Sequence, residues 1–332
     1  MRGIGILLIC LHNLLHLDSE VLECEFEFSQ ERISKLFQGL GEGLGSFIES
    51  CFSFWGWYGV SVFLFLSGYG LARKYEFSNH TVKLWPYLCH HYKKLVLLLI
   101  PAYIFFVINY YPKGIITPTD IIGQLTFTLN LYDARAITPG VYWYFGATMQ
   151  LYVVYILFHY KRSNIFLYVL SALSLLIGIY FAYAEHLTEV HYQLRHNFPL
   201  WLAIFTLGIW MARHAGSHLL RMMDIHWLLS TIILMLLWLG SSVWALLWVF
   251  SPLFVVAVIL LLARHCHFSG LTWIGKIAAG VFVCHPIIRM FALKGFDMGM
   301  NHLFVSIVYV LLSLVVGWGY LRLFRALKIS NE

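Results

Sequence analysis

Apolar stretches of about 20 residues recur along almost the whole chain, and no other feature of the sequence constrains the fold as strongly. A helix that crosses the hydrocarbon of a membrane needs roughly 20 mostly apolar residues. Charged residues make up 11% of this chain, whereas a water-soluble domain carries about 25%. The sequence therefore predicts an all-α fold: a polytopic transmembrane helix bundle that forms one integral membrane domain over residues 1–332.

About ten helices are expected to cross the membrane. The first apolar stretch begins beside Met1, as a signal peptide does, but no small-residue cleavage site follows it. We therefore expect it to remain a membrane helix, whereas the stretch 120–132 is too short to count as a span. The expected spans are 3–17, 52–72, 94–111, 140–159, 164–183, 198–212, 227–240, 243–263, 277–294 and 302–321.

The distribution of charge predicts the orientation of these helices. Cytoplasmic loops of membrane proteins carry an excess of Lys and Arg, and ten spans place both termini on the same side. With both termini cytoplasmic, every inward connection is basic. The basic residues on that side are Arg2, Arg73, Lys74, Lys83, Lys93, Lys94, Lys161, Arg162, Arg213, Arg221, Arg264, Lys276, Arg322, Arg325 and Lys328.

An acidic segment, residues 18–50, is expected on the outward side between the first two spans. It contains half of the 16 acidic residues of the chain, against two basic residues, Arg32 and Lys35. The segment is polar, and we expect it to be partly helical. Its return to the membrane is marked by four alternating glycines, which favour a flexible turn: Gly39, Gly41, Gly43 and Gly45.

Polar groups inside the first span are the first candidates for chemistry, because an ionisable residue in lipid usually faces a cavity or a partner. His12 lies ten residues after Arg2, about 15 Å along a helix, and shares a helical face with His16. A neutral imidazole at this depth can take a proton from a hydroxyl. A histidine that is simply hydrogen-bonded to a neighbouring helix remains the alternative.

Two later segments also combine polar groups with apolar spans. In the second span, Ser67 and Tyr69 could line a cavity, although small residues there also favour close helix packing. In the ninth span, His285 and Arg289 share a helical face. They could line a route for a substrate, or they could bond to helix carbonyls.

A cluster with metal-like composition occurs between the fifth and sixth spans. Loops of this composition are more often solvated, so we expect no metal site there or elsewhere in the chain. The residues of this outward cluster are His186, Glu189, His191, Arg195 and His196.

Four motifs, taken together and in order, resemble the acyltransferase-3 family of integral membrane acyltransferases. Arg2 followed by His12 resembles the first-helix signature of that family. The stretch 63–69, Phe-Leu-Phe-Leu-Ser-Gly-Tyr, resembles its aromatic segment ending in Ser-Gly-Tyr. The Trp143 helix, 142–152, and the segment 274–286 ending in His-Pro complete the resemblance.

The resemblance implies transfer of an acyl group, commonly acetyl, from a cytoplasmic acyl-CoA to a hydroxyl of a cell-surface glycan or other envelope molecule. It implies His12 as the catalytic residue with Arg2 as its companion toward the donor. Acetyl-CoA or another acyl-CoA is then a substrate, and no bound cofactor is expected. The cell inner membrane (plasma membrane) is the expected location, with membrane lipid as a partner and no nucleic acid.

The donor site departs from the family pattern. A pair of arginines three apart usually precedes the proline of the third helix, but here the segment reads His90-His91-Tyr92-Lys93-Lys94 before Pro101. Lys93 and Lys94, with Arg73, are therefore the expected donor-binding residues. A lysine offers a point charge instead of the bidentate fork of arginine. The residues expected to line the cavity are Ser67, Tyr69, Trp143 and His285.

A polytopic transporter or glycan-handling permease is the alternative function. Its intramembrane histidines would act as proton relays. Many transporters are built from two similar halves with interrupted helices at matching positions, and the sequence shows no such symmetry.

Overall fold

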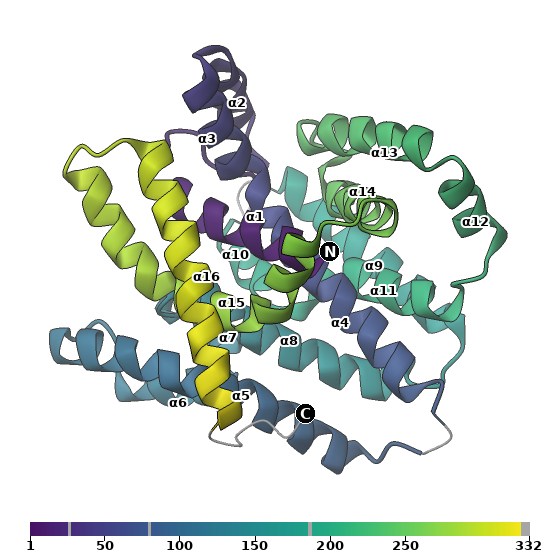
Figure 1. The fold of residues 1–332 in the computed structure, drawn as a ribbon. Helices are drawn as coiled ribbons and strands as arrows, with labels where there is room; N and C mark the ends of the chain where they lie inside the picture. Colours follow the sequence, from purple (N-terminus) through teal and green to yellow (C-terminus); the bar gives the residue numbers. More distant parts are fainter. Residues whose placement is uncertain (26–27, 79–80, 185–187, 327–332) are drawn as a thin grey trace.

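The computed structural model describes residues 1–25, 28–78, 81–184 and 188–326, and these residues form helices with no strand among them (Figure 1). The all-α prediction is confirmed. The helices are α1 (Arg2–Leu15), α2 (Gln30–Gly41), α3 (Leu44–Trp55), α4 (Gly59–Tyr75), α5 (Leu84–Tyr110), α6 (Pro118–Thr126), α7 (Leu129–Tyr132), α8 (Trp143–Val154), α9 (Asn164–Tyr183), α10 (Thr188–Arg195), α11 (Leu202–Arg213), α12 (His218–Ile225), α13 (Trp227–Ser242), α14 (Ser251–His265), α15 (Ser269–Asp297) and α16 (His302–Ala326).

Seven continuous helical segments within the described residues are long and apolar enough to cross a membrane. The pair α12 and α13 would make an eighth, although it bends by 101°. The expected count of ten is not confirmed, and cytoplasmic placement of both termini stays a prediction. The seven segments are Leu44–Tyr75, Leu84–Lys113, Gly140–His159, Asn164–Tyr183, Trp248–His265, Ser269–Asp297 and His302–Ala326.

The difference in count has a structural cause in α1. This helix has 14 residues, about 21 Å at 1.5 Å per residue, which is shorter than the hydrocarbon core of about 30 Å. It lies inside the bundle, packed against α3, α4, α15 and α16 (Figure 1). Neighbouring helices therefore surround most of α1, and it does not need the length of a lipid-facing span.

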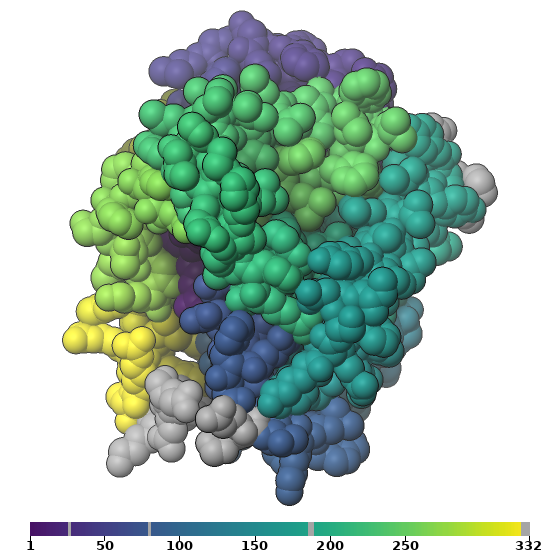
Figure 2. All heavy atoms as spheres, turned by 90° about the vertical axis from the view of Figure 1, so that its right-hand side faces the viewer, coloured from purple at the N-terminus to yellow at the C-terminus, as the bar shows by residue number. Residues whose placement is uncertain are grey.

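Apolar side chains cover the outside of the longer helices. On α13, Leu228, Leu229, Ile232 and Leu236 are all exposed, and this helix belongs to the face of residues 200–265 that is shown in green in Figure 2. Soluble monomers rarely expose continuous apolar surface of this kind. The outer surface is thus suited to lipid.

The acidic segment 18–50 contains a helical hairpin of α2 and α3, which confirms its partly helical character, while its outward placement stays a prediction. Ser29 caps α2 by accepting a bond from the backbone of Arg32, and Gly43, with φ of 116°, begins α3. Apolar residues of the hairpin and of the loop before it form a small core with Trp248. This core holds the loop that follows α1 against the end of the bundle.

Candidate active site

His12 is buried in α1, with 5% of its surface exposed, and its orientation is fixed by a backbone contact. Its Nδ1 lies 2.9 Å from the carbonyl oxygen of Ser53 on α3. Because a carbonyl only accepts hydrogen bonds, Nδ1 must carry the proton. In the neutral ring Nε2 then keeps a free lone pair. His12 is therefore held in the tautomer that a general base requires.

The helices can bring His12 this close to α3 because Gly56 lies opposite it. A Cβ atom at position 56 would lie 2.6 Å from Cβ of His12 and 2.9 Å from the carbonyl oxygen of Leu8. On the other side, the ring of His16 stacks on that of His12, with 4.6 Å between centroids. The imidazole is thus confined by packing as well as by its hydrogen bond.

A cavity of about 300 Å³ opens beside His12 and is called here the His12 cavity. Its wall combines residues from α1, from the loop after it, and from the starts of α4 and α8. The polar side chains on it include His12, Asn13, His16, Glu23, Glu25, His196 and Arg289; the aromatic ones are Trp57, Trp143, Tyr144, Tyr192 and Phe282.

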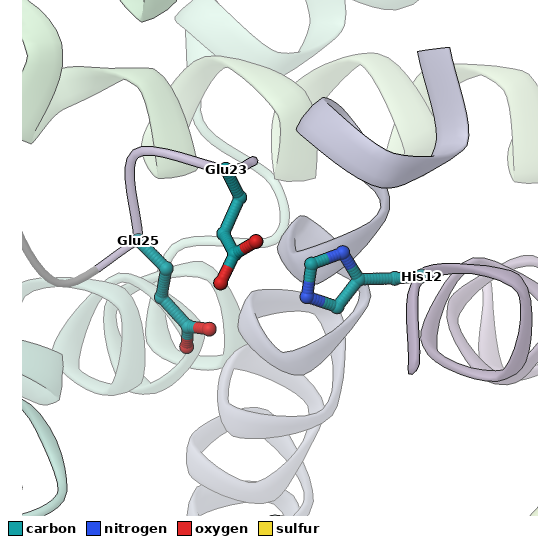
Figure 3. Close-up of side chains that lie close together, drawn as sticks. All are labelled: His12, Glu23 and Glu25. Carbon is teal, nitrogen blue, oxygen red and sulfur yellow. The ribbon is translucent and has the colours of Figure 1, made fainter. Parts of the chain in front are cut away.

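Two carboxylates in this cavity, Glu23 and Glu25, were not identified from the sequence. Both are buried, and Nε2 of His12 points toward them (Figure 3). One ligand atom of each of His12, Glu23 and Glu25 lies within 4.8 Å of the others, so these three residues could hold a divalent cation.

Burial raises the pKa of Glu25 to about 8; the positive charge of Arg195 opposes this increase and the negative charge of Glu23 adds to it. The only sequence signal was a Glu-x-Glu pair after the first span.

A second cavity, of about 450 Å³, is called here the basic cavity. Four cationic side chains line it, Arg2, Lys74, Lys94 and Lys276, together with His90 and His91. None of the described residues on its wall is acidic. Such a surface suits a ligand rich in phosphate.

The two cavities share a wall made by two aromatic side chains. Tyr144 of α8 and Phe282 of α15 line both of them, and their ring centroids are 5.1 Å apart. Ser67 lines the basic cavity. A group held in the basic cavity can therefore contact the same two rings as a group held in the His12 cavity.

The predicted donor-binding residues separate into two groups. Lys94 lines the basic cavity, as Arg2 does. Lys93 is exposed on α5 and lies outside the wall of either cavity. The guanidinium of Arg73 lies 4.9 Å from the ring centroid of Phe77, also outside these walls. The structure adds Lys74 and Lys276 in their place, which no motif had singled out as donor-binding.

The predicted cavity-lining residues also separate. Ser67 lines the basic cavity and Trp143 the His12 cavity. Tyr69 stacks on Phe65, with 6.4 Å between centroids, and His285 is buried within α15; neither is on the wall of these cavities.

The orientation of the His285 side chain is linked to Pro286. A proline has no N–H, so the carbonyl of Phe282, four residues earlier, loses its helical donor. Nδ1 of His285 lies 2.8 Å from that carbonyl oxygen and replaces the missing donor. Arg289, by contrast, reaches the His12 cavity and donates to the carbonyl oxygen of Asn13 over 3.2 Å.

The outward cluster that was expected to be solvated is largely buried, so that expectation was wrong for three of its members. His191, Arg195 and His196 are all buried. The guanidinium of Arg195 lies 4.1 Å from the ring centroid of Trp201 and 5.0 Å from that of Trp57. Glu189 is exposed and pairs with Arg135, while His186 lies outside the described residues.

The fold and its two cavities define a multi-pass helical membrane protein with a site that holds a buried histidine. Residues 1–322 match the acyltransferase domain model of the acyltransferase-3 type, and the chain belongs to this family. No curated protein and no solved structure matches it. Family and architecture together make the chain a membrane acyltransferase.

Proposed function

We propose that this chain transfers an acyl group, most simply acetyl, from cytoplasmic acyl-CoA to a hydroxyl of a cell-surface glycan or other envelope molecule. It would act in the cell inner membrane. The observation that carries the proposal is the wall shared by the basic cavity and the His12 cavity, made by Tyr144 and Phe282. A donor on one side of this wall and an acceptor on the other would meet at it.

The basic cavity is the donor site in this proposal. Coenzyme A carries a pyrophosphate and a ribose phosphate, and Arg2, Lys74, Lys94 and Lys276 supply the opposing charge. Arg2 can bind a phosphate through two parallel hydrogen bonds, which the lysines cannot do. The thioester end would extend toward Tyr144 and Phe282.

The His12 cavity is the acceptor site. Nε2 of His12 takes the proton of the acceptor hydroxyl as the oxygen attacks the thioester carbonyl carbon. A carbon–oxygen bond forms and a tetrahedral intermediate results. Its collapse breaks the carbon–sulfur bond, and the departing thiolate takes the proton back from the imidazolium. The products are an ester and free CoA, and His12 returns to its starting state.

The reaction requires the acyl group to reach the aromatic wall. Tyr144 and Phe282 line both cavities, so the acyl carbonyl would pass beside these rings or displace one to reach the acceptor. A small group such as acetyl passes with the least movement of the rings. This is why acetyl is the simplest acyl group for the site.

Transfer of label from acetyl-CoA by purified protein in lipid nanodiscs tests the proposal. Wild type should turn over [14C]acetyl-CoA and label a glycan fraction. His12→Ala should lose turnover by about 100-fold or more, and Arg2→Ala should weaken acetyl-CoA binding. His218→Ala and Arg221→Ala, both at exposed positions, are the matched controls and should behave as wild type. Wild type that neither binds nor turns over acetyl-CoA would contradict the proposal.

A further inference from the structure

Two carboxylates that the proposed reaction does not use lie beside its base. Glu23 and Glu25 belong to the segment between α1 and α2, where the chain has no helical structure. Both side chains line the His12 cavity and point toward His12 (Figure 3). Cys24, between them, packs into the small core of the hairpin. The fold therefore places both carboxylates in the His12 cavity.

This segment and the catalytic imidazole are held by the same residue. The carbonyl of Ser53 accepts the hydrogen bond from Nδ1 of His12, and the hydroxyl of Ser53 donates to the carbonyl of Val21. Arg32 of α2 also donates to the backbone carbonyl of Glu23, over 2.6 Å. The positions of the carboxylates and of His12 are thus coupled through α3.

Both carboxylates have an oxygen that lacks a donor. Glu23 is 8% exposed and Glu25 is 6% exposed. Oε2 of Glu23 and Oε1 of Glu25 are buried and have no hydrogen-bond partner among the described residues. An acceptor left unsatisfied in this way is destabilising unless a ligand provides the donor. The carboxylates and Nε2 of His12 face one another (Figure 3).

The surroundings favour hydroxyl groups over a metal ion as the missing donors. Arg289 lines the same cavity, and the charge of Arg195 acts on Glu25, so positive charge is already present. The indole rings of Trp57 and Trp143 form part of the wall. Apolar ring faces beside hydrogen-bond acceptors suit a molecule that carries both C–H surfaces and several hydroxyls.

We propose that Glu23 and Glu25 bind neighbouring hydroxyl groups of the acceptor and thereby place the reacting hydroxyl on Nε2 of His12. The acceptor is then a polyol of sugar type, with at least two adjacent hydroxyls, and not a simple alcohol. This inference rests on the proposed acyl transfer.

The test compares a polyol with a simple alcohol as acceptor. The probes are methyl glucoside, methyl galactoside, glycerol and 1-butanol, each offered with [14C]acetyl-CoA to the full chain in nanodiscs. Wild type should favour the polyols. Glu23→Gln and Glu25→Gln should raise the KM for polyol about 10- to 100-fold, while the KM for acetyl-CoA and the rate with 1-butanol change less than twofold. Glu31→Gln, at an exposed position of α2, is the control and should match wild type.

Each other outcome overturns the inference in a distinguishable way. If Glu23→Gln and Glu25→Gln had the same KM for the polyols as wild type, the carboxylates would not bind the acceptor. Wild type that acetylates 1-butanol or water but none of the polyols would exclude a polyol acceptor. If EDTA stops transfer and Mg²⁺, Mn²⁺ or Zn²⁺ restores it, then His12, Glu23 and Glu25 bind a metal ion instead of the acceptor hydroxyls. Wild type with no acetyl-CoA turnover would instead contradict the proposed function itself.

Discussion

The carbonyl oxygen of Ser53 lies 2.9 Å from Nδ1 of His12, and this contact determines which nitrogen of the ring can act as a base. The acceptor is a backbone atom, so no side-chain substitution at position 53 removes it directly. The hydroxyl of Ser53, by contrast, binds the carbonyl of Val21 in the loop that carries Glu23 and Glu25. The two bonds of Ser53 can therefore be separated by mutation.

Ser53→Ala should affect the loop more than the base. We expect a loss of about 1–2 kcal/mol in the free energy of unfolding, because the carbonyl of Val21 loses a buried donor. The KM for acceptor should rise several-fold, while the KM for acetyl-CoA stays constant. Thermal unfolding and steady-state kinetics measure these effects. Ser34→Ala removes an exposed hydroxyl of α2 and should change neither quantity; equal effects of both substitutions would contradict the argument.

Gly56→Ala should displace His12. The added methyl would lie 2.6 Å from Cβ of His12, and overpacking of this kind costs about 1–3 kcal/mol. Relief of the clash moves α1 away from α3 and lengthens the bond to Ser53, so kcat should fall at least tenfold.

Gly41→Ala is the control for this prediction. A Cβ at position 41 has no neighbour within 4 Å, and the variant should keep wild-type stability and kcat. Thermal unfolding and kcat are measured for both variants side by side. If Gly56→Ala retained full activity, the close approach of α1 would not be needed for the position of the base.

Lys93 and Lys94 should differ although they are adjacent in the sequence. Lys94 lines the basic cavity and Lys93 does not. Lys94→Ala should raise the KM for acetyl-CoA about tenfold at low ionic strength and less at high salt, because salt screens the contact with phosphate. Lys93→Ala should change it less than twofold. Equal effects of the two substitutions, measured at 20 and 300 mM salt, would remove the basic cavity as the donor site.

The sequence predicted those features that depend on local pattern. Apolar stretches of membrane-spanning length identified the helical class, and the spacing of Arg2 and His12 placed them at different depths of one helix. The difference between Lys93 and Lys94 could not be predicted, because it depends on the rotation of α5 about its axis in the bundle. The count of ten spans is not confirmed, in part because the short helix α1 is enclosed by neighbouring helices.

The carboxylates of the site were missed for a similar reason. An acidic loop is normally solvated, and Glu23 and Glu25 are buried only because the hairpin of α2 and α3 packs beside them. Aromatic rings from other parts of the chain cover two residues of the outward cluster in the same way: His191 lies against Phe181 and Trp248, and Arg195 lies against Trp57 and Trp201. No periodicity in the sequence signals that a loop will be covered by other parts of the chain.

The stability of the protein should depend on the protonation of Glu25. Burial raises the pKa of Glu25 to about 8 from 4.5, so between these values the folded chain keeps a proton that the unfolded chain releases. The contribution of Glu25 to the free energy of unfolding therefore falls as pH rises from 4.5 to about 8, and it is constant above that interval. Burial and the charge of Arg195 lower the pKa of His191 to about 4, and burial lowers that of His196 to about 4 as well. Between about pH 4 and 6.5 these two histidines are protonated in the unfolded chain but not in the folded one. They therefore make stability rise with pH, but only below about pH 6.5.

The interval from pH 6.5 to 8 isolates the effect of Glu25. Over this interval wild type should lose about 2 kcal/mol relative to Glu25→Gln, because each pH unit of differential protonation is worth about 1.4 kcal/mol. Glu25→Gln is neutral at every pH and should lack this slope, whereas Glu31→Gln should follow wild type. Thermal unfolding of the three proteins in one detergent, at half-unit steps of pH, measures the difference. Parallel curves for wild type and Glu25→Gln would mean that Glu25 is already ionised in the folded protein, held by a cation or by hydrogen-bond donors.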